Sequence, residues 1–123
     1  MSLYVYGDKN VEVPTQLHFG KYLMKQLLMG GDTIAVEHAD TEEKLTYKEL
    51  LQHAVNLASE LMKLGIGRGD IVAVGSEKRN TLIITIFAVT FTGATYTAYD
   101  LHSGKFSLKH KISVAHLTIS YFF

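Results

Sequence analysis

Residues 71–100 read IVAVGSEKRNTLIITIFAVTFTGATYTAYD, and this stretch decides the fold. It begins with an apolar run, Ile71–Gly75, that lacks the apolar/polar alternation of a half-exposed strand, so we expect a strand covered on both faces. A long apolar segment, Thr81–Thr92, follows, and a second β-prone run, Thr95–Tyr99, leads to Asp100. Strand, buried helix and strand make the βαβ unit, whose crossover is expected to be right-handed. The sequence therefore predicts an α/β protein with a mostly parallel sheet.

The residues before this unit predict a helix and a hairpin that flank it. Thr15 is a candidate N-cap for a helix that runs to about Leu28, with its apolar residues on one side. Alternation over residues 33–39 then predicts a half-buried strand. A polar turn leads to a second short strand at residues 44–45, so the two strands are expected to pair as an antiparallel hairpin.

A second helix is predicted by its own start signal. Residues 46–49, Thr-Tyr-Lys-Glu, form a capping box, in which the Thr46 hydroxyl accepts from the Glu49 amide and the Glu49 carboxylate accepts from the Thr46 amide. The apolar residues that follow recur at spacings of three and four, as in an amphipathic helix. They are Tyr47, Leu50, Leu51, Ala54, Leu57, Ala58 and Leu61. Gly65 stands where a helix ends in a left-handed residue.

The glycine-rich stretch 65–70, GIGRGD, invites two functional interpretations. A dinucleotide-binding loop follows a strand and opens a helix, whereas this stretch follows a helix and opens a strand. The tripeptide Arg68-Gly69-Asp70 also occurs in adhesion signals, but a match of three residues arises often by chance. We therefore predict a helix-to-strand turn here.

The residues after Asp100 resemble one more repeat of strand and helix. They predict a polar loop, a short helix from Ser107 to about Val114, and a strand over Leu117–Phe123. That last run is uncharged and free of proline and glycine, a composition prone to aggregation, and a parallel sheet that stops here exposes an unpaired edge. The isolated chain is thus expected to be poorly soluble. The whole organisation predicted is one partial domain over residues 1–123, with an irregular lead-in (1–14), a helix and hairpin (15–46) and an αβαβαβ unit (47–123).

Composition excludes several classes of function. Twelve acidic residues balance twelve basic ones, so no global field attracts nucleic acid or an anionic membrane. Without cysteine the chain has no disulfide and no thiol chemistry, and no secretory signal is recognisable, so the cytoplasm is the expected compartment. The uncharged stretch between Asn80 and Tyr99 has about the length of a membrane span, but Gly93 and several threonines argue against that alternative.

No catalytic, cofactor-binding or metal-binding residue is predicted. The six histidines lack the spacing of metal ligands; they are His18, His38, His53, His102, His110 and His116. Gly75 and Asp100 end successive strands, as in a dinucleotide fold, but the loop after Gly75 has one glycine where that motif needs three. A basic cluster near the C-terminus is interpreted as a solvated helix face, with a phosphate or coenzyme patch as the alternative. Its members are Lys105, Lys109, His110 and Lys111.

Three motifs resemble those of the adenylate-forming (ANL) enzymes. Leu45–Leu50, LTYKEL, fits their first core motif, L(T/S)YxEL, and Leu64–Val72, LGIGRGDIV, resembles their LGxGxGDxV turn. Thr92–Asp100, TGATYTAYD, is similar to their second core motif, KAGAxYxPxD, although lysine is replaced by Thr92 and proline by Ala98. The runs 75–78 and 108–112 resemble the branch of firefly-luciferase-like proteins and 4-coumarate–CoA ligases. The chain thus resembles the N-terminal part of an acyl-CoA synthetase or luciferase-like enzyme.

This resemblance implies a chemistry that the 123 residues do not complete. In that family a carboxylate attacks the α-phosphate of ATP with Mg²⁺, and coenzyme A then displaces AMP, while luciferases oxidise the adenylate. The phosphate loop ending in Pro-Lys-Gly and the catalytic lysine lie beyond the second core motif, and neither occurs here. The resemblance gives Thr46, Glu49, Gly65 and Gly93 structural roles. An inactive N-terminal fragment, without cofactor of its own, is therefore expected.

Two alternatives stay open beside the fragment. The chain could be a non-catalytic module that binds a full-length relative or the missing remainder of the enzyme, or it could be a membrane-associated segment. The acid substrate, the oligomeric state and the choice between ligase and luciferase chemistry are not fixed by this sequence.

Overall fold

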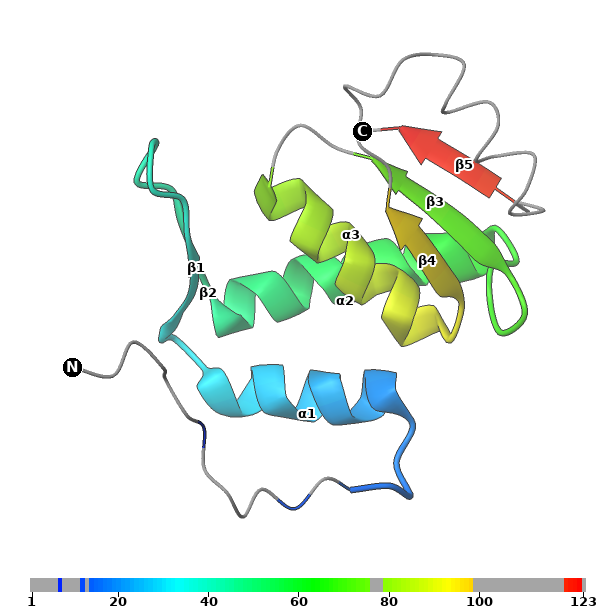
Figure 1. Cartoon of the computed structure of the whole chain (residues 1–123), viewed down its shortest axis with the longest axis horizontal. Coiled ribbons are helices and arrows are strands. Elements are labelled where there is room, and N and C mark those ends of the chain that lie inside the picture. Colours follow the sequence, from blue (N-terminus) through cyan, green and yellow to red (C-terminus); the bar gives the residue numbers. More distant parts are fainter. Residues whose placement is uncertain (1–6, 8–11, 13, 76–78, 99–118, 123) are drawn as a thin grey trace.

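Figure 1 shows the chain as a computed structural model, which describes residues 7, 12, 14–75, 79–98 and 119–122. The described elements are α1 (Phe19–Gly30), β1 (Ile34–Glu37), β2 (Lys44–Thr46), α2 (Tyr47–Lys63), β3 (Ile71–Gly75), α3 (Arg79–Thr92), β4 (Thr95–Ala98) and β5 (Ile119–Phe122). The short helix expected from Ser107, the basic cluster near it and Asp100 lie outside the described residues.

The parallel sheet forms as the apolar pattern predicts. Its strand order is β4-β3-β5, so β3 is the central strand, and Val72 is paired with Tyr96 on one side and with Ile119 on the other. Residues 72–75 are all buried. A strand without alternation is thus covered on both faces, and the α/β fold with a mostly parallel sheet is confirmed.

The antiparallel hairpin is also confirmed. Val36 of β1 is paired with Leu45 of β2, and Glu37 with Lys44, whose side chains make an ion pair of 3.1 Å. These two strands form a sheet of their own, separate from the parallel one. In Figure 1 the hairpin stands at the end of the fold where α1 stops and α2 begins.

The start of α1 differs from the prediction. The helix begins at Phe19 rather than after Thr15, and His18 is its N-cap, with Nδ1 accepting from the Gly20 amide at 3.2 Å. The N-cap preference for Ser, Thr, Asp and Asn points to Thr15, but any side-chain acceptor that reaches the second helical amide can cap. The helix also continues past Leu28, and Gly31 at φ +54° follows its last residue.

The core lies where α2, α3 and β3 meet. Its buried members are Ala58, Leu61, Ile66, Val72, Val74, Ala88 and Val89. Alanines 54, 58 and 88 are almost wholly buried, and small side chains let α2 and α3 approach closely. Burial of this apolar surface is the main force that holds the helices on the sheet.

Helix α3, which contains the apolar segment Thr81–Thr92, is buried or half-buried along its described length. Among its described side chains only Thr85, Ala88 and Val89 are buried, and the others are half-buried. The buried hydroxyl of Thr85 donates to the Thr81 carbonyl at 2.7 Å, which satisfies it within the helix. None of the described side chains of α3 is exposed, and α1, α2, β3 and β4 all contact this helix, as expected of a helix inside an α/β layer. None of the described helices combines the length and the apolarity that a bilayer-spanning helix requires.

Candidate functional site

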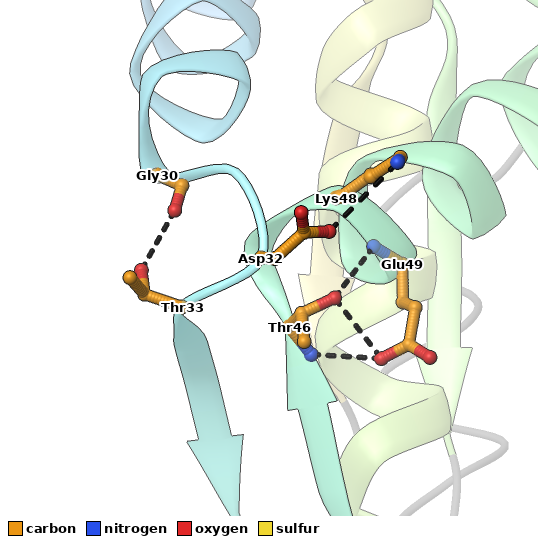
Figure 2. A network of polar contacts seen from close by, with 6 residues as sticks. All are labelled: Gly30, Asp32, Thr33, Thr46, Lys48 and Glu49. Atoms are coloured by element: carbon orange, nitrogen blue, oxygen red, sulfur yellow. Dashed lines mark hydrogen bonds and ion pairs between the residues drawn. The ribbon is translucent and has the colours of Figure 1, made fainter.

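The first matched motif builds the N-terminus of α2 (Figure 2). The Thr46 hydroxyl accepts from the Glu49 amide at 3.2 Å, and the Glu49 carboxylate accepts from the Thr46 amide at 2.9 Å and from the Thr46 hydroxyl at 3.1 Å. These are the reciprocal bonds of a capping box. The predicted structural role of Thr46 and Glu49 is confirmed.

The turn between α1 and β1 completes this helix start. The amides of Tyr47 and Lys48 donate to the carbonyls of Thr33 and Gly31 at 3.0 and 2.9 Å. The first three amides of α2 therefore all have protein acceptors, where a helix normally leaves such groups open. An anion would find none of these three free, so the geometry does not make this helix start a phosphate site.

Further contacts fix the same turn. Figure 2 shows the Thr33 hydroxyl donating to the Gly30 carbonyl at 2.7 Å, and the amine of Lys48 lying 3.8 Å from the carboxylate of Asp32. The ion pair is exposed on both sides and contributes little. A Cβ added at Gly30 would overlap the side chain of Tyr47, so only glycine lets the end of α1 lie this close to the start of α2.

The capping box predicts a dependence of stability on pH. Hydrogen bonds from the amide and the hydroxyl of Thr46 hold the pKa of the Glu49 carboxyl below its ordinary value of 4.5, and the charge of His53 acts in the same direction. A group with a depressed pKa in the folded state stabilises the fold above its unfolded pKa, and this contribution is lost as the pH falls through the folded pKa. Urea unfolding at pH 7 and pH 3 measures how much free energy of unfolding is lost on acidification. This loss is expected to be smaller for Glu49→Gln than for the unmodified chain.

Glu60→Gln is the matched control for that experiment. Glu60 lies on the same helix and makes an exposed ion pair with Lys63 at 2.7 Å, so this variant removes the same charge without touching the cap. Glu60→Gln is expected to lose as much free energy of unfolding between pH 7 and pH 3 as the unmodified chain. If both variants reduced this loss equally, the effect could not be assigned to the cap.

The second motif is a turn, as predicted. The amides of Gly65 and Ile66 donate to the carbonyls of Met62 and Leu61 at 2.9 and 3.1 Å, the bonding pattern of a Schellman helix end with Gly65 at φ +86°. Ile66 is buried in the core. The loop of glycines therefore serves to end α2 and to return the chain to the sheet.

Asp70 is held inside this turn. Its carboxylate accepts from the Gly67 amide at 2.8 Å, and its carbonyl accepts from the Thr95 amide at 2.9 Å at the start of β4. Because the carboxylate folds back onto its own loop, Arg68-Gly69-Asp70 is not displayed as an adhesion ligand would be. Gly93, at φ +83°, similarly ends α3 before β4.

The edge where ligands bind in open α/β sheets is formed here by the ends of three strands. The carboxyl ends of parallel strands lie at one edge. Gly75 ends β3 and is paired with Phe122 of β5, while Ala98 ends β4 and is paired with Val74. Ala98 occupies the position of the motif's proline. The described residues bring backbone ends to this edge. Glu77 and Asp100, the carboxylates that follow β3 and β4 in the sequence, are outside them.

A surface hollow of about 270 Å³ lies at the opposite edge, next to the start of β4. It is lined by His18, Phe19, Thr90, Gly93, Ala94, Thr95 and Tyr96. The hollow includes the amino end of β4, whereas the fold places a nucleotide at the carboxyl ends of the strands. His18 is engaged as an N-cap, and His38 accepts from the Thr41 amide at 3.3 Å. Within the described ranges no cluster of histidine and acidic side chains could hold a metal ion.

Comparison with known proteins supplies the family. The model of the family described as AMP-binding enzyme matches residues 24–120. The chain is 33% identical over 98 residues to tyrocidine synthase 3 of Brevibacillus parabrevis, a match that covers 80% of this chain and 2% of that protein. It is 38% identical over 69 residues to nonribosomal peptide synthetase 8 of Aspergillus fumigatus, which covers 56% of this chain and 1% of that protein. The chain thus spans a very small share of these relatives.

Solved structures show the same fold. The luciferase-like enzyme from the nonluminescent mealworm Zophobas morio superimposes with a TM-score of 0.81 at 22% identity, over 89% of this chain and 27% of that one. The N-terminal subdomain of Klebsiella oxytoca NpsA in complex with anthranilyl-AMSN superimposes with a TM-score of 0.75 at 23% identity, over 84% and 26%. These relatives are peptide synthetases, a luciferase-like enzyme and NpsA, so they support the superfamily and not the narrower branch of acyl-CoA synthetases. With three motifs in order and a family model that matches most of its length, the chain belongs to the AMP-binding enzyme family.

Proposed function

We propose that this chain supplies a supporting part of the N-terminal domain of an adenylate-forming ligase. Such an enzyme activates a carboxylic acid with ATP as an acyl adenylate and then passes the acyl group to a thiol. One observation supports the proposal most directly. The side chains of Thr46, Glu49 and Asp70 all accept hydrogen bonds from backbone amides of their own caps and turns. On this proposal residues 1–123 belong to one domain.

The described residues do not fit ATP and Mg²⁺ by themselves. The first amides of α2 have protein acceptors, the carboxylate of Asp70 is engaged in its turn, and the described residues contain no cluster of histidine, aspartate and glutamate side chains that could hold a metal ion. The sequence has one proline, Pro14, which is followed by Thr15, so a Pro-Lys-Gly phosphate loop is not among these residues. We therefore assign no step of the reaction to this chain alone.

The narrower assignment concerns the thiol that receives the acyl group. The runs 75–78 and 108–112 support coenzyme A as the acceptor, in the manner of 4-coumarate–CoA ligases. The likeness to tyrocidine synthase 3 supports instead a peptide synthetase as the relative, with an amino acid as the acid. A coenzyme A ligase and a peptide synthetase share the adenylation step. With either of them, this chain supplies a supporting part of the domain.

A second candidate function is a non-catalytic module that binds a full-length relative. The half-buried apolar side chains of α3 support it, because a further layer of protein would cover them. Co-purification of the chain with a synthetase would favour this candidate over the supporting part of a single polypeptide.

Exchange of pyrophosphate into ATP tests the proposal. The purified chain, offered fatty, aromatic and amino acids in turn, is expected to give no exchange above a blank. A chimera of a tyrocidine synthase 3 adenylation domain, in which this chain replaces the matching 98 residues, is expected to retain exchange with the acid that its parent prefers. Exchange by the chain alone, or a folded chimera with a new acid preference, would contradict a purely supporting role.

A further inference from the structure

Helices α1 and α2 border an open surface groove that none of the matched motifs uses. The groove has a volume of about 410 Å³ and is lined by Lys21, Met24, Lys25 and Leu28 of α1 and by Leu51 and Val55 of α2. We call it the α1–α2 groove. The two helices run in opposite directions, since the end of α1 at Gly30 packs against Tyr47 at the start of α2 (Figure 1).

The floor of the α1–α2 groove is apolar and open to water. Leu28 is 70% exposed and Met24 is 36% exposed, and both project from α1 beside the half-buried Leu51 and Val55. Apolar surface gathered in a recess, rather than scattered singly, is typical of a binding site, because covering it releases the water against it.

The rim of the groove carries positive charge. Lys21 and Lys25 lie one turn apart on α1, a helix whose twelve residues include no aspartate or glutamate. Three other lysines of the described chain make ion pairs with carboxylates; they are Lys44, Lys48 and Lys63. Neither Lys21 nor Lys25 has a described carboxylate within ion-pair distance. The groove is therefore complementary to an apolar surface that is bordered by negative charge.

We propose that the α1–α2 groove binds an amphipathic helix of a partner protein, with an apolar stripe against Met24, Leu28, Leu51 and Val55 and acidic residues facing Lys21 and Lys25. An amphipathic helix lying in an apolar groove is a recurring mode of recognition, read through anchors at i, i+3, i+4 and i+7. The site goes beyond the proposed adenylation role and does not depend on it.

Charge disfavours one of the other two possible occupants, and the shape of the groove disfavours the second. A second copy that presented its own α1 would bring Lys21 and Lys25 against the same two lysines. An anionic membrane is best met by the apolar face of a single helix, whereas the apolar side chains here line a groove shared by two helices. An amphipathic helix with acidic residues matches both the shape of the groove and the positive charge of its rim.

Fluorescence anisotropy with designed peptides tests the proposal on the full chain. The probe is a labelled helical peptide of about four turns, with leucine at i, i+3, i+4 and i+7 and flanking glutamates. A second peptide has lysine in place of every glutamate. The acidic peptide is expected to bind saturably, and more weakly as salt screens the rim. Leu28→Ala is expected to weaken it about tenfold, because a buried leucine side chain is lost from the contact.

A charge reversal gives the decisive comparison. Lys21→Glu with Lys25→Glu is expected to weaken the acidic peptide about fivefold and to improve the lysine peptide, so that the preference inverts. Lys44→Glu with Lys63→Glu changes the net charge equally at exposed sites outside the groove and is expected to leave the preference unchanged. Equal binding of both peptides, or an inversion by the control pair, would overturn the proposal. Two further results would overturn the proposal if the acidic peptide does not bind. One is binding to phosphatidylserine vesicles that Leu28→Ala abolishes, and the other is dimerisation in sedimentation that Leu28→Ala abolishes.

Discussion

Replacing Leu61 with alanine is expected to lower the free energy of unfolding by about 3 kcal/mol. Leu61 is 4% exposed and belongs to the core cluster in which α2, α3 and β3 meet, so truncation leaves a cavity within that cluster. Folded proteins have total stabilities of about 5–15 kcal/mol, so a loss of this size is a large share of the total. Urea unfolding followed by far-UV circular dichroism measures the effect.

Met62→Ala is the matched control, since it lies next to Leu61 on the same helix and removes a side chain of similar size. Met62 is 54% exposed, and its loss is expected to change stability by less than about 0.5 kcal/mol. Both variants introduce alanine, so helix propensity hardly distinguishes them. If the two variants lost equal stability, the core would not lie at the junction of α2, α3 and β3.

Local signals predicted most of the described fold. The capping box at Thr46 and Glu49 and the non-alternating run Ile71–Gly75 each correspond to one low-energy local structure, so helix start and central strand follow from the residues alone. The start of α1 did not follow, because His18 caps through a ring nitrogen, which the usual ranking of N-cap residues passes over. The residue at which α1 begins depends on where α1 contacts α3, and that is a tertiary contact.

Sequence reasoning names no catalytic or binding residue in this chain, and the reason is physical. The motif residues that identify the family in this part of the chain act as caps and turns, so recognising them reports the scaffold and not the reaction. Asp70, for example, is the acidic residue of the LGxGxGDxV turn, yet its carboxylate is bound to the Gly67 amide. The α1–α2 groove was not foreseen either. Periodicity places Met24 and Leu28 on an apolar side of α1, but it cannot show that α2 leaves them open to water.

The crossing of α1 over α3 depends on a residue without a side chain. Gly20 is buried, and a Cβ added there would lie 2.7 Å from the carbonyl oxygen of Thr90, which is a backbone atom and cannot rotate away. His18, which caps the same helix, lies within 3.2 Å of that Cβ position. The N-terminus of α1 therefore reaches α3 at this distance only because residue 20 is glycine.

Gly20→Val is expected to lower the free energy of unfolding by about 2–3 kcal/mol, because α1 must move away from α3 to relieve the overlap with Thr90. Valine is a slightly better helix former than glycine, so helix propensity alone would slightly raise the free energy of unfolding. The steric overlap lowers it, so the sign of the measured change shows which effect dominates. Gly67→Val is the control, since its added Cβ would have the Thr92 carbonyl oxygen as its nearest neighbour at 4.0 Å, an ordinary contact. Thermal unfolding monitored by circular dichroism compares the two variants. A Gly20→Val chain as stable as Gly67→Val would show that α1 does not pack on α3 at Gly20, and the placement of α1 in the fold would be wrong.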